Sequence, residues 1–263
     1  MKNLKLVAIS MTLVSSLSFA EAPSADEIMK KNFMTSKFTD STADQSMRLI
    51  NKDGKERVRE SSGLTKLIPG TTDNQRLVTF NSPSDVKGTK NLLVEHSDKE
   101  DDIWIYLPAL KKVRRLVASN KKDAFAGTDF SYGDIIGYKV EDWNHKFVKE
   151  DTVDGKACWL IESTAKDAAI SSTYGVSKRV NCIEKDSSIA ISGESYDLNG
   201  KLLKKYSSRD LKKLDEKANK WAPMIQEASN VETGHKTIIE FKNYKVNTGV
   251  SDAVFTTRSL EKR

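Results

Sequence analysis

Residues 101–138 read DDIWIYLPALKKVRRLVASNKKDAFAGTDFSYGDIIGY, and this stretch indicates the fold. Five apolar residues run without a break from Ile103 to Leu107, and a proline turn follows. An exposed antiparallel strand alternates apolar and polar residues, because successive side chains point to opposite faces. Here the odd-numbered residues point one way, and Trp104 and Tyr106 point the other. Both faces must therefore be covered, which favours a curved β-barrel with a lid or a cargo over one side.

Turn signals separate similar β-rich runs along the rest of the chain. Asp-Gly at 53–54 and 154–155 and Asn-Gly at 199–200 are typical of hairpin turns. Strands joined by hairpins usually pair with each other, so the sheet is expected to be largely antiparallel. The pattern predicts about a dozen strands, near residues 44–50, 56–67, 75–82, 91–96, 103–107, 143–151, 157–164, 174–184, 188–198, 201–210, 224–231 and 236–246.

Two short helices are also predicted. Ser24 and Glu27 have the spacing of a capping box, and a helix of about ten residues follows them. Its apolar side consists of Ile28, Met29 and Phe33. A second, shorter helix is expected to begin near Tyr132, after a loop whose Asp129 or Ser131 is suited to cap it.

The first twenty residues resemble a secretory signal peptide. Lys2 and Lys5 precede an apolar stretch, and Ser18-Phe19-Ala20 matches a cleavage site after Ala20. The stretch is short for a membrane span, and a retained anchor helix is the alternative. Residues 1–20 are therefore predicted to be a signal peptide of bacterial type, and the periplasm is the expected location.

Composition argues against nucleic-acid binding. The formal net charge of +6 includes Lys2 and Lys5, and removal of residues 1–20 would leave +4. This mild excess is spread along the chain without a concentrated basic face or a recognised motif. A solvated basic surface is the simple interpretation, and weak attraction to anionic lipid headgroups is the functional one.

Cys158 and Cys182 are expected to pair in an oxidising compartment. Both lie in predicted strands, and a hairpin centred near Ile170 would place them directly opposite each other. Two buried free thiols are the alternative. Their separation is not that of a CxxC redox motif, so thioredoxin-like chemistry has no support.

The block from Trp104 to Leu116, WIYLPALKKVRRL, and the block from Gly127 to Asp134, GTDFSYGD, resemble the LolA-like outer-membrane lipoprotein-sorting family. The segments CWLIEST at 158–164 and DLNGKLLK at 197–204 are similar to it as well. The resemblance implies a mainly β fold, an incomplete and strongly curved antiparallel β-barrel with a helical lid over its concave apolar face. It also implies one LolA-like lipid or lipoprotein carrier domain over residues 21–263.

The resemblance implies a carrier of lipid or lipoprotein acyl chains between membrane components. Within the family, the chain looks similar to the relatives that accompany RND-type (MMPL-like) exporters. The resemblance therefore implies an inner-membrane transporter and an outer-membrane acceptor as partners. An interaction or regulatory module of an exporter that holds no lipid is the alternative function. The candidate cavity and lid residues, each of which is otherwise ordinary core, are Ile28, Met29, Phe33, Trp104, Ile105, Tyr106, Leu107, Phe125, Phe130, Tyr132 and Ile135.

The cations of the strand after the proline turn are candidates for contact with a headgroup or a partner, or else form a solvated strand surface. They are Lys111, Lys112, Arg114 and Arg115. No catalytic pattern is found, because His96, His145 and His235 lack metal-ligand spacing and no nucleophile elbow, P-loop or dinucleotide fingerprint occurs. We therefore expect neither an enzyme nor a cofactor, although distant residues can converge in a fold.

Overall fold

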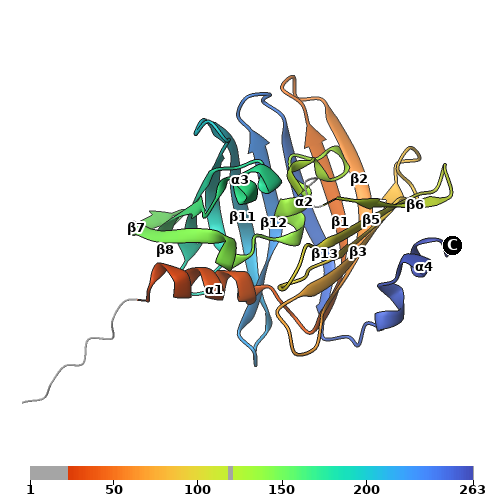
Figure 1. Ribbon diagram of the computed structural model, residues 1–263, viewed down its shortest axis with the longest axis horizontal. Helices are drawn as coiled ribbons and strands as arrows, with labels where there is room; N and C mark the ends of the chain where they lie inside the picture. Colours follow the sequence, from red (N-terminus) through yellow and green to blue (C-terminus); the bar gives the residue numbers. More distant parts are fainter. Residues whose placement is uncertain (1–22, 118–120, 263) are drawn as a thin grey trace, which may run out of the picture.

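Thirteen antiparallel strands form one curved sheet in the computed structural model, which describes residues 23–117 and 121–262 (Figure 1). The predicted signal peptide, residues 1–20, lies outside the described residues. The strand order is β6-β5-β4-β3-β2-β1-β13-β12-β11-β10-β9-β8-β7, so nearly all neighbours in the sheet are neighbours in the chain. β6 and β7 form the two edges and do not pair, so the barrel is incomplete, as predicted.

The strands of the first half, together with the helix before them, precede residue 118. The elements are α1 (Ala25–Thr35), β1 (Asp40–Ile50), β2 (Glu56–Leu67), β3 (Asn74–Ser82), β4 (Lys90–Val94), β5 (Asp102–Leu107) and β6 (Lys112–Leu116). Three short helical elements follow, η2 (Phe125–Gly127), α2 (Tyr132–Ile136) and η3 (Val140–Asp142).

The second half begins at the other edge of the sheet. Its strands are β7 (Trp143–Val153), β8 (Lys156–Ala165), β9 (Lys178–Glu184), β10 (Ala190–Tyr196), β11 (Leu202–Asp215), β12 (Lys220–Asn230) and β13 (Lys236–Val246). Three helical elements accompany them, α3 (Ala168–Tyr174), η4 (Asp252–Val254) and α4 (Thr257–Leu260).

Local sequence signals account for most of these boundaries. The capping box predicted at the first helix is present, since the Ser24 side chain accepts from the backbone of Glu27 and the Glu27 side chain accepts from Ser24. A second capping box, from Ser131 and Asp134, opens α2. The predicted turn at Asp154-Gly155 joins β7 to β8, and both of its residues have positive φ, as a two-residue hairpin loop requires.

The strand predicted for residues 174–184 is wrong at its start. A helix, α3, ends at the first residue of this region, Tyr174, and Gly175 follows it in the left-handed conformation. β9 therefore begins only at Lys178. Asp167 caps α3 by accepting from the backbone of Ile170, so the residue expected at the centre of a hairpin is helical instead.

The chain crosses from one edge of the sheet to the other over its concave face. After β6 it runs through residues 121–142, here called the crossing segment, and enters β7 at the opposite edge. η2, α2 and η3 belong to this segment, which Figure 1 shows in front of the sheet. With α1, it forms the helical lid of the fold.

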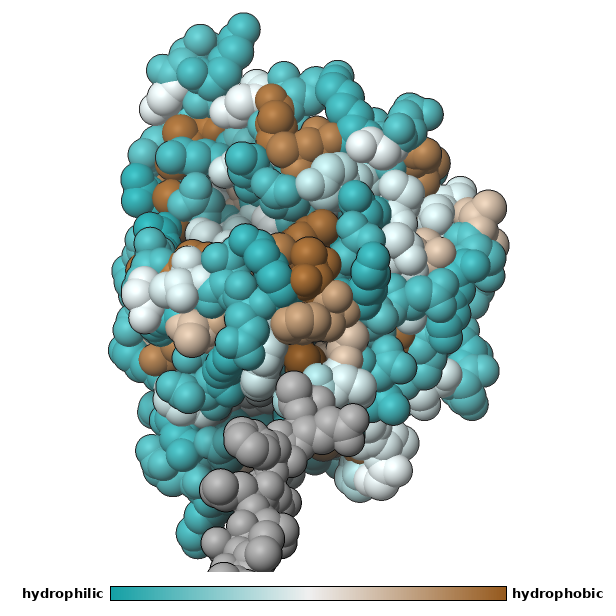
Figure 2. Space-filling view, turned by 90° about the vertical axis from the view of Figure 1, so that its left-hand side faces the viewer, coloured by the Kyte–Doolittle hydropathy of each residue, from teal (hydrophilic) through white to brown (hydrophobic). Residues whose placement is uncertain are grey.

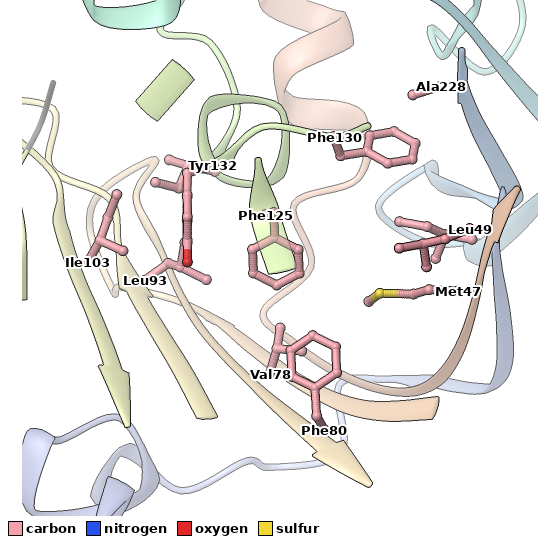
Figure 3. Close-up of a cluster of buried hydrophobic side chains, with 12 residues drawn as sticks. Met47, Leu49, Val78, Phe80, Leu93, Ile103, Phe125, Phe130, Tyr132 and Ala228 are labelled. Carbon is pink, nitrogen blue, oxygen red and sulfur yellow. The ribbon is translucent and has the colours of Figure 1, made fainter. Parts of the chain in front are cut away.

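The main core lies between the crossing segment and the inner face of β1 to β5 (Figure 3). Phe125 lies at its centre, with its ring 5.4 Å from that of Tyr132 and 6.1 Å from that of Phe80. Ile103 from β5 and Met47 from β1 are fully buried in the same cluster. This packing covers the inner face of the strand that the sequence analysis began with.

A second cover lies on the outer face of the same strands. The C-terminal segment, residues 250–260, buries Phe255 and Leu260 against Leu77 and Leu92, and Trp104 packs there as well. Both faces of β5 are thus covered, as its unbroken apolar sequence requires. The outer cover is a segment of the chain itself, which the sequence analysis did not identify.

Candidate functional site

A cavity of about 390 Å³ lies between the concave face of the sheet and the lid. This volume falls in the range of pockets that hold small ligands. Residues of α1, of the crossing segment and of strands β1–β3 and β7–β13 contribute to its wall. Parts of the chain that are far apart in sequence meet around this space, which is therefore the candidate binding site.

Apolar side chains from the lid and the sheet form one part of the wall. They include Met29, Phe33, Val78, Phe125, Phe130, Ile135, Ile136, Val140, Trp143, Ile239 and Phe241. The lid residues among them belong to two different hydrophobic clusters. Met29 packs with the α1 cluster on β8 and β9, whereas Phe125 and Phe130 belong to the main core. The apolar part of the wall is thus shared between two separate lid elements.

Five of the eleven predicted cavity residues line the cavity: Met29, Phe33, Phe125, Phe130 and Ile135. Ile28 and Tyr132 are buried beside it in the two lid clusters. Their position is fixed by local signals, since a capping box sets the start of each helix and so the face that it presents.

The assignment of Trp104 and Tyr106 to the cavity is wrong. Both lie on the outer face of β5, where the C-terminal segment covers them. Ile105 and Leu107 share the inner face with Ile103 but do not line the cavity. Strand alternation predicted the two sets of residues correctly but gave no indication of which face is concave.

The four predicted basic contacts do not form one face. Lys111 lies in the turn before β6 with a positive φ, and the other three are exposed on β6. Lys112 and Arg114 pair with Leu107 and Ile105 in the register of the sheet, so they share the inner face.

Arg115 is on the outer face, opposite Trp104, where it forms an ion pair with Asp102. A contact with a headgroup or a partner therefore involves at most two of these side chains on one face of the strand.

Polar residues form the other part of the cavity wall, and the sequence analysis missed them. Lys37 follows α1, forms an ion pair with Glu95 and donates to the carbonyl oxygen of Thr72 at 2.6 Å. Burial lowers the pKa of Lys37, and the Glu95 carboxylate opposes this effect. Arg76 on β3 donates to the carbonyl oxygen of Ile135 and so connects the sheet to α2.

Asp134, in α2, is the centre of a group of hydrogen bonds. Its carboxylate accepts from the backbone and hydroxyl of Ser131, from the hydroxyl of Tyr138 at 2.8 Å and from the hydroxyl of Tyr206 at 3.3 Å. Burial, together with the Asp134 charge, raises the pKa of both tyrosines, which therefore remain protonated donors. Lys204 lies 3.8 Å from the carboxylate. These bonds attach the crossing segment to β11.

His145 is a neutral part of the wall. Its Nδ1 is 2.8 Å from the Ser163 hydroxyl and its Nε2 is 3.1 Å from the carbonyl oxygen of Val140. The carbonyl can only accept, so Nε2 carries the proton and Nδ1 accepts from Ser163. Burial lowers the pKa of His145, which favours this uncharged form.

The two cysteines are joined by a disulfide, with their Cα atoms 5.5 Å apart. They are not directly opposite, however. Cys158 pairs with Glu184, and Cys182 pairs with Leu160, so the cysteines are diagonal neighbours. The difference of two residues arises because α3 shifts the centre of the β8–β9 connection. The bridge packs with Ile191 in a cluster separate from those that the lid forms.

The histidines lie in separate places. His96 bonds Asp102, and His235 lies 2.6 Å from Asp129, in a pair that attaches the crossing segment to the residue before β13. Within residues 23–117 and 121–262, no group of three or more His, Cys, Asp or Glu side chains is placed to hold a metal ion. No helix in the same ranges has the length and apolar character needed to span a membrane.

The surface near β7 and β8 is mostly hydrophilic, with separate hydrophobic groups of atoms between polar ones (Figure 2). Phe147 and Val148 on β7 are among the larger exposed apolar residues. Isolated residues of this kind are normal on protein surfaces. The larger apolar clusters of the fold are buried beneath its covers.

Comparison with known proteins gives both a family and a fold. A family model described as an uncharacterized protein matches residues 72–262. The structure is similar to an outer membrane lipoprotein-sorting protein domain from Vibrio parahaemolyticus, with 26% identity and a TM-score of 0.82 over 90% of this chain and 98% of that one. A DUF1329 family protein from Desulfovibrio piger is 27% identical, with a TM-score of 0.82 over 90% and 97% of the two chains.

A more distant structure supports the fold alone. It is a LolA superfamily protein from Nitrosomonas europaea, which is 18% identical, with a TM-score of 0.68 over 90% of this chain and 99% of that one. No curated protein matches the chain. These findings agree with the architecture of an open antiparallel sheet under a helical lid.

Proposed function

The chain belongs to the LolA-like outer-membrane lipoprotein-sorting family, and we propose that it is a periplasmic carrier of a lipid or a lipoprotein acyl chain. The observation that carries this proposal is the cavity between the sheet and two independent lid elements. Seven apolar side chains of the lid line that cavity, namely Met29, Phe33, Phe125, Phe130, Ile135, Ile136 and Val140. An acyl chain placed against them would gain about 0.8 kcal/mol for each buried CH₂ group.

A carrier must also release its cargo, and the lid is suited to move. α1 has two buried apolar residues, Ile28 and Met29, and side-chain bonds that join its second half to the loop after β9. α2 is a helix of five residues that is held through Asp134 and Arg76 and that buries Tyr132 and Ile136 in the main core. The contacts of α1 are few beside those of the hydrogen-bonded sheet, so displacement of this helix need not disturb the strands.

We propose that an inner-membrane RND-type exporter and an outer-membrane acceptor are the donor and the receiver of this cargo. The support is the resemblance of the central block to relatives that accompany such exporters. The exposed cations Lys112 and Arg114, at the rim of the inner face, are candidates for contact with one of these partners or with anionic headgroups.

Lipid binding is tested with the mature protein purified gently from the periplasm. We expect mass spectrometry of the extracted lipids to find a bound acyl species, and a fluorescent fatty acid to bind after its removal. Ile135→Gln, in the cavity wall, is expected to weaken binding of the fluorescent fatty acid at least tenfold, by roughly 1.4 kcal/mol or more.

Ile105→Gln is the matched control, because Ile105 is on the same inner face but outside the cavity wall. This variant is expected to retain the wild-type affinity. If the folded wild type neither contains lipid nor binds the fatty acid, the carrier is excluded and an exporter-associated interaction module becomes the better assignment.

A further inference from the structure

Most charged side chains of the cavity wall have a nearby partner of opposite charge. Among the described residues of the wall, four ion pairs account for five such side chains: Lys37–Glu95, Lys139–Asp101, Asp134–Lys204 and Glu227–Arg209. His145 is neutral in its hydrogen-bonded form. Two arginines remain without a carboxylate within 4 Å, Arg76 and Arg179.

Arg76 and Arg179 differ in what they do in the fold. Arg76 donates to the backbone of Ile135 and so has a role in holding the lid. Arg179 has no such bond among the described residues. Its guanidinium lies over the ring of Tyr138, 3.7 Å from the ring centroid, and its Nε atom is shielded from solvent without a hydrogen-bond acceptor.

The stacking fixes Arg179 while leaving its donors available. A guanidinium that lies on an aromatic ring uses its face, whereas its N–H groups point outward in its own plane. The Tyr138 ring is fixed in turn, since its hydroxyl bonds Asp134 and the ring stacks on Tyr174 at 4.7 Å. The guanidinium of Arg179 is thus held at the cavity wall, and no hydrogen-bond acceptor among the described residues pairs with its N–H groups.

The residues beside Arg179 in the sheet are polar but uncharged. The register places Ser163 on β8 and Ser195 on β10 directly opposite Arg179, so the three side chains share the concave face. The hydroxyl of Ser163 is used by His145. Neither neighbour carries the negative charge that a part-buried guanidinium favours.

We propose that Arg179 binds the anionic head group of the cargo, a carboxylate or a phosphate on an acyl chain. Arginine suits both, because its fork of donors matches two oxygens of either group. The acyl chain would then lie against the apolar side chains of the same cavity wall, such as Met29 and Phe33. This inference rests on the proposed carrier function and specifies the chemistry of its ligand.

The test compares three lipids with the same acyl chain on delipidated mature protein by titration calorimetry. Palmitate carries a carboxylate, palmitoyl lysophosphatidate carries a phosphate, and monopalmitoylglycerol is neutral. We expect the wild type to bind at least one anionic lipid about tenfold more tightly than the neutral one. The stronger anion identifies the head group, and inorganic phosphate alone is expected to bind far more weakly.

Variants separate the charge of Arg179 from its packing. Arg179→Gln is expected to reduce the preference for the anionic lipid to less than about threefold, whereas Arg179→Lys retains part of it. Arg48→Gln is the matched control, since Arg48 lies on the other face of the sheet in an exposed pair with Glu56. Carboxyl-labelled palmitate gives an independent readout by NMR, because its bound carboxylate should stay ionised to lower pH in wild type than in Arg179→Gln.

Several results would overturn the proposal while leaving the carrier intact. These are equal binding of neutral and anionic lipids by the wild type, an equal loss for all three lipids in Arg179→Gln, or inorganic phosphate binding as tightly as lysophosphatidate. If the wild type binds none of the lipids, the carrier function itself fails. Thermal unfolding of each variant shows whether a loss of binding comes from loss of the fold.

Discussion

The guanidinium of Arg76, on strand β3, donates a hydrogen bond to the backbone carbonyl of Ile135 on the lid helix α2. Arg76 lies in a row of the inner face between Thr65 on β2 and Leu93 on β4, so its side chain extends from the floor of the cavity to its cover. One side chain of the sheet thus contacts a helix of the lid directly.

Removal of this contact is expected to loosen α2 without unfolding the sheet. Arg76→Gln loses a charged hydrogen bond worth about 1–3 kcal/mol, so the amides of Ile135 and Gly137 should exchange with solvent roughly tenfold faster or more. Hydrogen exchange measured by NMR checks this, with the amide of Ile239 on β13 as the internal reference. Unchanged exchange at α2 would show that Asp134 alone holds the lid.

The disulfide is expected to stabilise the fold without contributing to the cavity. Replacement of both cysteines, Cys158→Ala with Cys182→Ala, should lower the free energy of unfolding by about 3 kcal/mol in the chain-entropy model. Urea unfolding with and without reductant measures this, and only the wild type should respond to reductant. Peptide mapping that finds both thiols free in periplasmic protein would contradict the bridge.

The outer face of β5 is expected to affect stability rather than binding. Trp104→Gln removes a side chain that the C-terminal segment packs on, and the loss should be about 1–3 kcal/mol. Limited proteolysis should then cut within residues 250–260 first, while the affinity for a fluorescent fatty acid stays at the wild-type value. A selective loss of affinity in a folded protein would place Trp104 functionally with the cavity.

His145 is expected to make the fold less stable in mild acid. Because burial lowers its pKa in the folded state, the unfolded chain takes up its proton first as the pH falls below about 6.5. Stability is therefore retained above that value and falls between it and the lowered pKa of the folded protein. His145→Gln should reduce the slope of the unfolding free energy against pH in this range, by an amount that corresponds to at most about one bound proton. Urea unfolding at several pH values measures this slope. A slope identical to that of the wild type would show that other groups cause any acid sensitivity.

The strands and turns could be predicted from the sequence because their signals are local. The run at 103–107 required two covered faces, and the Asp-Gly and Asn-Gly pairs placed the hairpins. The C-terminal segment has no comparable signal, since its helical elements η4 and α4 contain only three and four residues. Only the tertiary contact with Trp104 and Leu92 shows that it is the outer cover.

The polar part of the cavity was not predictable for a related reason. Arg76 is the one charged residue of β3, and Arg179 follows Lys178 at the start of β9. Neither position has a sequence signal that separates a cavity arginine from a solvated one. The cross-strand register provides this information, because it places Arg179 on the same face as Ser163 and below the lid. The predicted position of Cys182 failed by two residues because α3, with Asp167 and Gly175 at its ends, replaces the expected hairpin turn and shifts the register.

The Asn181 side chain in the cavity floor is expected to need a residue without a Cβ atom at position 193. The two residues are directly opposite on β10 and β9, and a Cβ atom at Gly193 would lie 2.4 Å from Oδ1 of Asn181. Gly193→Ala should therefore force the amide out of place, at a cost of about 1–3 kcal/mol in stability, and reduce fatty-acid binding.

The decisive measurement is the same glycine substitution in an Asn181→Ala background. The backbone of Gly193 does not have positive φ, so alanine is free to adopt it once the amide is absent. In that background Gly193→Ala should be neutral or stabilise by about 0.5–1 kcal/mol, because alanine loses less backbone freedom on folding. A double-mutant cycle in urea would thus show a change of sign. Equal costs of the substitution in both backgrounds would mean that something other than Asn181 requires the glycine.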